Sequence, residues 1–133
     1  MKYMLMMNAM SSGDQYGGAS GWQKSDVEAH IAFVKNLTNS LRESGELVST
    51  EGLDLPQRAK VVRAGKNGSP ITDGVFPESK EFLAGYWIVK VDSPEQAYAI
   101  AARASAAPGP GGKPLNMPIE VREVMSGPPP EIL

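Results

Sequence analysis

Residues 85–91 read GYWIVKV, and this short stretch decides the fold. Successive side chains of a strand point to opposite faces, so Trp87 and Val89 share one face while Tyr86 and Ile88 share the other. Both faces are therefore apolar, which is typical of a strand covered on both sides. We predict that these residues form a central strand of a sheet.

Residues 2–8, KYMLMMN, have the same pattern, with one apolar face formed by Tyr3, Leu5 and Met7 and the other by Met4 and Met6. They predict a second central strand. Shorter extended runs at residues 46–55 and 118–125 predict two further strands.

Two segments have the spacing and the end signals of helices. In residues 25–45, apolar side chains recur at helical spacing, at Val27, Ile31, Val34, Leu37 and Leu41. Ser25 with Glu28 predicts a capping box at the start of this helix, and Gly45 predicts a left-handed stop. Residues 93–104 begin with a capping serine, a proline at the first helical position and a glutamine, and they predict the second helix.

Residues 59–74 predict a hairpin inserted between strands, because Asn67-Gly68 separates two short extended runs. The full order, strand, helix, strand, hairpin, strand, helix, strand, is that of split βαβ units. We therefore predict an α+β, ferredoxin-like antiparallel sheet with both helices on one face and the first and third main strands in the centre. The other apolar face of these strands predicts a homodimer through the sheet face.

The composition narrows the classes of function. The 133 residues include 13 basic and 15 acidic ones, for a formal charge of -2, and the basic residues are scattered, which argues against a nucleic-acid partner. Cysteine is absent, which removes thiolate chemistry and fits a cytoplasmic protein. The apolar run of residues 1–10 is shorter than a signal-peptide core or a membrane span, so we expect no membrane partner.

Several segments together resemble the YCII-related proteins, in particular the subgroup named for an Asp-Gly-Pro-Phe motif. They are MKYMLMM at the start, AHIAFVKNL at 29–37, STEGL at 49–53, TDGVFPESKEFLAGYWIVKV at 72–91 and IEVREVM at 119–125. The motif reads Asp73-Gly74-Val75-Phe76 here, with valine in place of its proline. The resemblance covers a single domain of residues 1–125, followed by a tail of residues 126–133.

The resemblance implies a ferredoxin-like fold that dimerises as an α/β barrel. It also implies an enzymatic site in which a histidine and an aspartate meet in a pocket, and the matching candidates here are His30 and Asp73. Related barrels catalyse several different reactions, so the likeness of fold says little about the chemistry.

His30 is the only histidine of the chain and lies within the apolar stripe of the first predicted helix. A carboxylate that accepts from one ring nitrogen would orient the other as a general base. The alternative is a core histidine with its hydrogen bonds satisfied and no catalytic role. Both interpretations stay open from sequence.

Asp73 precedes a glycine in a predicted turn, where an aspartate often bonds its own backbone, so turn formation alone could explain it. Glu78 and Lys80 alternate in sign ahead of a strand, as a solvated surface segment does, but they are also candidates for anchoring a substrate together with Glu51.

Other site types have less support. A metal would have to be held by His30, Asp73 and glutamates such as Glu51 or Glu78, with no second histidine, so we predict no metal and no cofactor. Residues 109–114, GPGGKP, have no Ser or Thr after the lysine, and we predict a flexible loop rather than a phosphate site. No Gly-x-Ser-x-Gly elbow occurs.

The sequence therefore favours a dimeric small-molecule enzyme with a pocket between the first helix and the sheet, where His30, oriented by Asp73, moves a proton. The alternative is a non-catalytic dimer that binds a ligand or has a regulatory role.

Overall fold

The computed structural model describes residues 1–10, 21–74 and 81–128. Its elements, in chain order, are β1 (Lys2–Met10), α1 (Lys24–Ser44), β2 (Leu47–Gly52), β3 (Lys60–Ala64), β4 (Pro70–Gly74), β5 (Glu81–Lys90), α2 (Pro94–Ser105) and β6 (Ile119–Glu123), with 3₁₀ turns at Pro56–Arg58 and Pro110–Gly112. Within these described ranges, no helix is long and apolar enough to cross a membrane.

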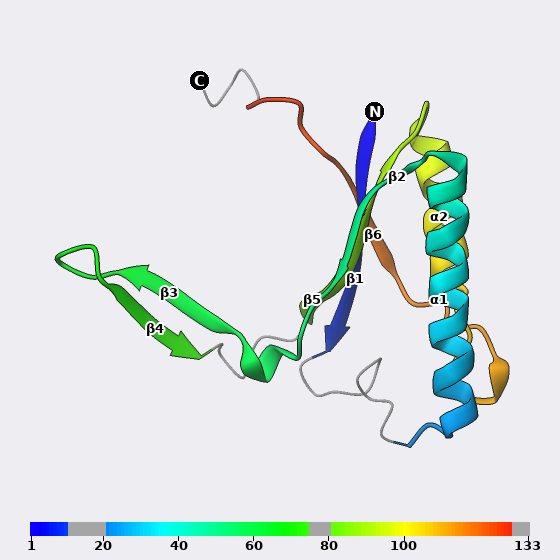
Figure 1. Cartoon of the computed structure of the whole chain (residues 1–133), viewed down its shortest axis with the longest axis horizontal. Coiled ribbons are helices and arrows are strands. Elements are labelled where there is room, and N and C mark those ends of the chain that lie inside the picture. The colour runs from blue at the N-terminus through cyan, green and yellow to red at the C-terminus, as the bar shows by residue number, and fades with distance from the viewer. Residues whose placement is uncertain (11–20, 75–80, 129–133) are drawn as a thin grey trace.

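Four strands form one antiparallel sheet in the order β2-β5-β1-β6, so the two strands with apolar side chains on both faces are the central pair. Both helices lie against the same face of this sheet (Figure 1). The predictions of an α+β fold and of two central strands are confirmed.

The core lies between the sheet and the helices. Trp87 is 2% exposed, and Leu5 and Val89 are completely buried beside it. The Trp87 Nε1–H donates to Thr38 Oγ1 of α1 at 3.0 Å, so the largest core side chain is bonded as well as packed. The remaining core residues include Tyr3, Leu37, Leu41, Val91, Ala97, Ile100, Ala101 and Ala104.

Two of the three helix-end signals in the sequence match the structure. Gly45 ends α1 in the left-handed region at φ 81°, and Ser93 caps α2 by accepting from the Gln96 N–H. Gln96 supports the same end, because its Oε1 accepts from the Asp92 N–H at 2.6 Å. The capping box predicted at Ser25 is wrong: α1 begins one residue earlier, at Lys24, and its cap position, Gln23, makes no side-chain bond.

Strands β3 and β4 pair only with each other and form a ribbon that we call the arm, residues 60–74. The arm projects away from the sheet on the side opposite the helices (Figure 1). Gly68 has φ 77°, so the predicted hairpin turn at Asn67-Gly68 is confirmed. The turn predicted at Asp73 is wrong, because Asp73 lies within β4, opposite Val61.

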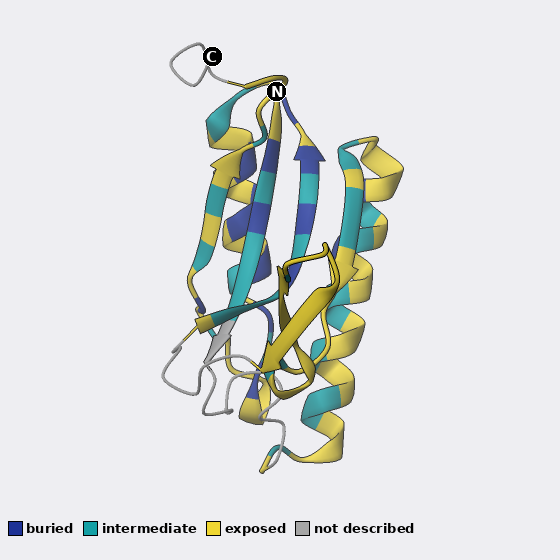
Figure 2. Ribbon diagram, turned by 90° about the vertical axis from the view of Figure 1, so that its left-hand side faces the viewer, coloured by how far each residue is buried: buried dark blue, intermediate teal, exposed yellow. Residues whose placement is uncertain are grey.

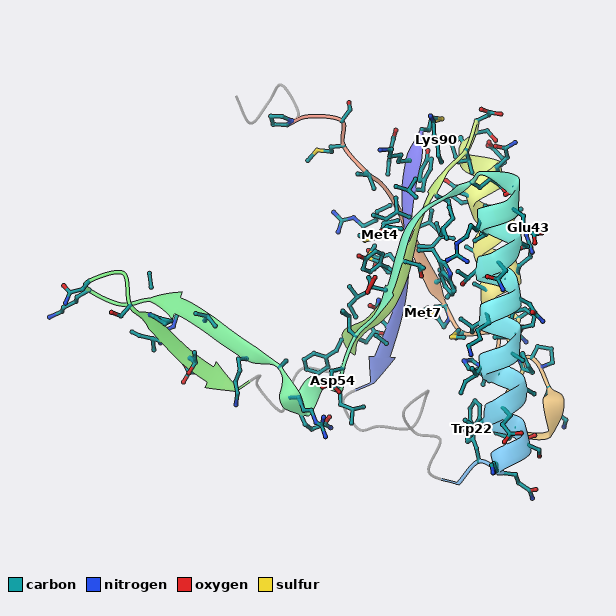
Figure 3. All side chains as sticks on the ribbon, viewed as in Figure 1. Met4, Met7, Trp22, Glu43, Asp54 and Lys90 are labelled. Atoms are coloured by element: carbon teal, nitrogen blue, oxygen red, sulfur yellow. The ribbon has the colours of Figure 1, made fainter. Side chains whose placement is uncertain are left out.

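The sheet face that turns away from the helices is called here the open face. Met4 of β1 lies opposite Ile88 of β5, and Met6 lies opposite Tyr86, so these four side chains share this face. All four are half-buried (Figure 2), and Figure 3 shows Met4 on the open side and Met7 on the helix side of β1. The apolar second face that the sequence predicts is therefore present, and neither α1 nor α2 covers it.

Candidate functional site

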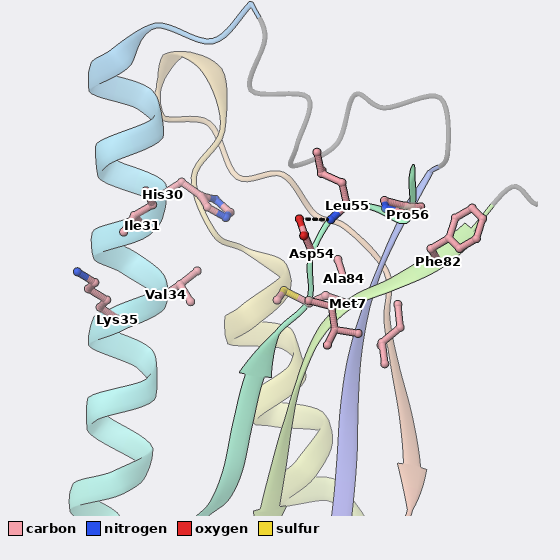
Figure 4. Close-up of a pocket in the computed structure, with 12 residues that line it drawn as sticks. Met7, His30, Ile31, Val34, Lys35, Asp54, Leu55, Pro56, Phe82 and Ala84 are labelled. Atoms are coloured by element: carbon pink, nitrogen blue, oxygen red, sulfur yellow. Dashed lines mark hydrogen bonds between the residues drawn. The ribbon is translucent and has the colours of Figure 1, made fainter. Parts of the chain in front are cut away.

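A cavity of about 530 Å³ lies between α1 and the end of the sheet nearest the arm (Figure 4). This volume is in the usual range for small-molecule sites. Its described lining comes from four places: β1, α1, the segment that follows β2, and the start of β5. The lining residues are Met7, His30, Ile31, Val34, Lys35, Leu53, Asp54, Leu55, Pro56, Phe82, Leu83 and Ala84.

The wall of the cavity is unusual for its exposed apolar side chains. Ile31, Leu53 and Leu55 are 47%, 50% and 52% exposed, and all three line this cavity. Large apolar side chains gathered in the open around a hollow mark a place where a ligand or partner removes them from water. The observation favours an occupant that is itself largely apolar.

The His30 side chain projects from α1 beside these apolar residues, and its ring points into the cavity (Figure 4). Nδ1 lies 3.0 Å from the Pro108 carbonyl oxygen. A carbonyl can only accept, so Nδ1 carries the proton, and in the neutral ring the lone pair is then on Nε2. The Trp22 ring meets the imidazole edge to face, with centroids 5.7 Å apart. The histidine is thus oriented on one side by a backbone oxygen and on another by an aromatic ring.

The Pro108 carbonyl is held by the loop between α2 and β6. Gly109 N–H donates to Lys113 O at 2.7 Å, and Leu115 N–H donates to Ala107 O at 2.9 Å. These bonds close residues 107–115 into a compact turn, which corrects the prediction of a flexible loop at 109–114. The loop has a role that the sequence did not reveal, since it supplies the acceptor for His30.

Two charged side chains share the cavity with His30. Asp54 lies across the cavity from it, with Oδ1 accepting from the Leu55 N–H at 2.7 Å. Its Oδ2 lies 3.5 Å from Arg58, an exposed pair that contributes little to stability. Lys35, one turn beyond Ile31 on α1, brings a cation to the rim. The cavity therefore offers a base, a carboxylate and a cation in apolar surroundings.

Asp73, the predicted partner of His30, lies on the arm and is not among the described residues that line the cavity. Its carboxylate pairs with Arg63 at 3.6 Å on the arm, where both side chains are more than half exposed. Figure 1 places β4 and α1 on opposite sides of the sheet, so the structure does not bring Asp73 and His30 of one chain together. The nitrogen that Asp73 was expected to orient is bonded to Pro108 instead.

Of the three predicted substrate-binding residues, the structure describes one. Glu51 is exposed on β2, opposite Tyr86, and is absent from the described lining. Glu78 and Lys80, together with Val75 of the family motif, fall in residues 75–80, outside the described ranges. Across residues 1–10, 21–74 and 81–128, no three His, Asp or Glu side chains converge as ligands for a metal ion.

Of the site residues, the sequence identified His30 through its place on the helix stripe. Lys35 and Ile31 lie on the same helix, one turn apart, and a wider search of that face could have included them. Asp54, which lines the cavity, and Pro108, which binds His30 Nδ1, had no such signal, because each lies in a loop whose path is set by the tertiary fold.

Comparison with known families adds one finding. The sequence model of the YCII-related domain matches residues 1–109 of this chain. In a comparison with proteins of curated function, none matches this chain.

Proposed function

We propose, from the premise that this chain belongs to the YCII-related domain family, that it is a small-molecule enzyme in which His30 acts as a general base. The observation that carries the proposal is the His30 ring, fixed by Pro108 and directed into a cavity walled by exposed Ile31 and Leu55. The substrate is a small, largely apolar molecule with an acidic hydroxyl, or with a C–H bond next to a carbonyl.

The proton transfer uses both ring nitrogens. Nε2 takes the proton from the substrate, and the substrate keeps the bonding electrons as an oxyanion or enolate. The Nδ1–H bond to the Pro108 oxygen strengthens as the ring becomes positive, so it stabilises the imidazolium. Nε2 then returns the proton to a different atom of the same molecule, so the product is an isomer of the substrate and no co-reactant is needed.

A carboxylate partner completes the proposal. Asp54 is the carboxylate that lines the cavity opposite His30, where it can accept a hydrogen bond from a polar group of the substrate. The sequence predicts that Asp73 pairs with His30 within one chain; we propose instead that Asp73 contributes from a second copy. Glu51, Glu78 and Lys80 likewise stay predicted substrate contacts, and membership of the Asp-Gly-Pro-Phe subgroup stays a prediction.

We further propose a ferredoxin-like arrangement that assembles as a dimeric α/β barrel. The strand order β2-β5-β1-β6 supports it, as do Met4, Met6, Tyr86 and Ile88 on the open face. Polar side chains flank this apolar strip, with Glu51 on β2 and Glu120 and Arg122 on β6. An apolar centre with a polar rim is the usual composition of a protein interface. A cytoplasmic location remains a prediction from the sequence.

A thermal-shift screen with a library of small organic acids, phenols and ketones tests the enzyme proposal, followed by turnover assays on every hit. We expect hits that stabilise the wild type but not Ile31→Trp, which fills the mouth of the cavity. We also expect that at least one hit is converted and that His30→Gln lowers its turnover by about 100-fold or more. Asn36→Ala, an exposed change on the same helix, is the matched control and should leave both results unchanged.

This assay also distinguishes the two functions that the sequence left open, an enzyme and a non-catalytic ligand-binding protein. A hit that binds the cavity and is never consumed identifies a non-catalytic ligand-binding protein. Hits that stabilise the wild type and Ile31→Trp equally would contradict a ligand site in this cavity altogether.

A further inference from the structure

The arm has features that the proposed small-molecule site does not explain. All ten residues of β3 and β4 are exposed, including Val61, Val62 and Ile71 at 41%, 58% and 44%. Figure 2 shows both strands of the arm exposed, in front of the buried and half-buried sheet. A two-stranded ribbon without further packing is marginally stable in water, so a partner that covers the arm would add to its stability.

The two faces of the arm differ in charge. Residues directly opposite each other share a face, so Val61, Arg63, Ile71 and Asp73 lie together and contain the Arg63–Asp73 pair. The other face, here called the docking face, consists of Val62, Ala64, Pro70 and Thr72. The docking face has no charged group between the lysine at the base of the arm, Lys60, and the lysine at its tip, Lys66.

The charge of the chain indicates what covers this face. Of the 13 basic and 15 acidic residues, three basic and one acidic lie in residues 60–74, so the arm carries +2 and the rest of the chain carries -4. A second copy of the same chain therefore offers the arm an oppositely charged body. The arm also points to the side of the open face, so a copy that covers this face approaches from the side to which the arm extends (Figure 1).

We propose that the arm is a dimerisation clasp, whose docking face packs on a second copy of this chain while Lys60 and Lys66 face its acidic body. The inference rests on the homodimer proposed above and goes further by assigning part of the interface to the arm. In a symmetric dimer each copy gives one arm and receives one, so each apolar docking face is buried.

Sedimentation velocity of the full-length chain over a range of concentrations tests this. Val62→Glu places a carboxylate on the docking face, and we expect it to raise the dimer dissociation constant by about tenfold or more. Ile71→Glu is the matched control, since its added carboxylate falls on the charged face directly opposite Arg63 and should have a much smaller effect. Both positions are exposed, and circular dichroism should show both variants folded.

A third variant, Ile88→Glu on the open face, separates failure of the clasp from failure of the dimer. A wild type that dimerises, is dissociated by Ile88→Glu and is insensitive to Val62→Glu would overturn the clasp and leave the dimer standing. A wild type that is monomeric at every concentration would overturn both. Equal weakening by Ile71→Glu and Val62→Glu, or binding of a duplex DNA probe through Lys60 and Lys66 by a monomeric wild type, would also overturn the clasp.

Discussion

The ring N–H groups of His30 and Trp87 each donate a hydrogen bond to an oxygen from a distant part of the chain. The two bonds have different roles. Trp87 donates to Thr38 inside the core, where an unmet donor would lower stability. His30 donates to the Pro108 carbonyl at the edge of a cavity, where the bond decides which ring nitrogen can act as a base. The first pairing therefore concerns folding, and the second concerns chemistry.

The Trp87–Thr38 bond leads to a stability prediction. Thr38→Val keeps the shape of the side chain and removes the acceptor, so the free energy of unfolding should fall by about 1–3 kcal/mol. Urea denaturation measures this. In a Trp87→Phe background the donor is already gone, and the same Thr38 change should then cost much less. Equal costs in both backgrounds would show that the bond is not the cause.

Tyr3 gives a prediction about pH. Burial, followed by the nearby charges of Glu123, Tyr98 and Glu95, raises the pKa of the Tyr3 hydroxyl above its ordinary value of 10.0. The folded chain therefore holds this proton more tightly than the unfolded chain. The stability from this effect is complete below about pH 10 and is lost as the pH rises through the folded pKa.

Chemical denaturation across this alkaline range checks the prediction. Tyr3→Phe should flatten the fall in unfolding free energy, whereas Tyr98→Phe, at an exposed position, should keep most of it. An unchanged pH profile in Tyr3→Phe would contradict the assignment.

Among the elements, those with strong local patterns were predictable. The alternation of apolar side chains located β1 and β5, and Gly45, Ser93 and the Asn67-Gly68 turn located ends and reversals. Predictions were wrong where tertiary contacts, and not the local sequence, determine the conformation of a residue. Asp73 reads as a turn residue beside Gly74, but cross-strand pairing with Val61 keeps it in a strand.

The C-terminal end of α1 gives a prediction for an element. Gly45 has φ 81°, and its N–H and that of Glu46 return to the carbonyls of Arg42 and Leu41. Gly45→Ala should lower the free energy of unfolding by about 1–2 kcal/mol, because a side chain is strained in the left-handed region. Gly52→Ala is the matched control, since no atom lies within 4 Å of the added Cβ and its φ is not positive. Thermal or urea denaturation compares them, and equal losses would contradict the role of Gly45.

In the molecule as a whole, three apolar surfaces are the basis of the proposals: the cavity wall, the open face and the arm. The sequence pointed to the second directly, through strands that are apolar on both sides. For the cavity it identified His30, but not Asp54 and Leu55, which a loop brings there, nor Pro108, whose carbonyl holds the His30 ring. Distances between loops depend on the packing of the complete chain, and a single sequence does not contain them in readable form.

The central claim is that His30 is the base of a small-molecule cavity, and its ring nitrogens can be observed directly. It is the only histidine, so ¹⁵N NMR of the chain without an affinity tag yields one imidazole spin system. We predict a neutral ring protonated at Nδ1, with an Nε2 signal that moves when a library hit stabilises the wild type and stays still in Ile31→Trp. A proton on Nε2 in the neutral ring, or stabilising hits that leave the Nε2 signal unmoved, would contradict the account.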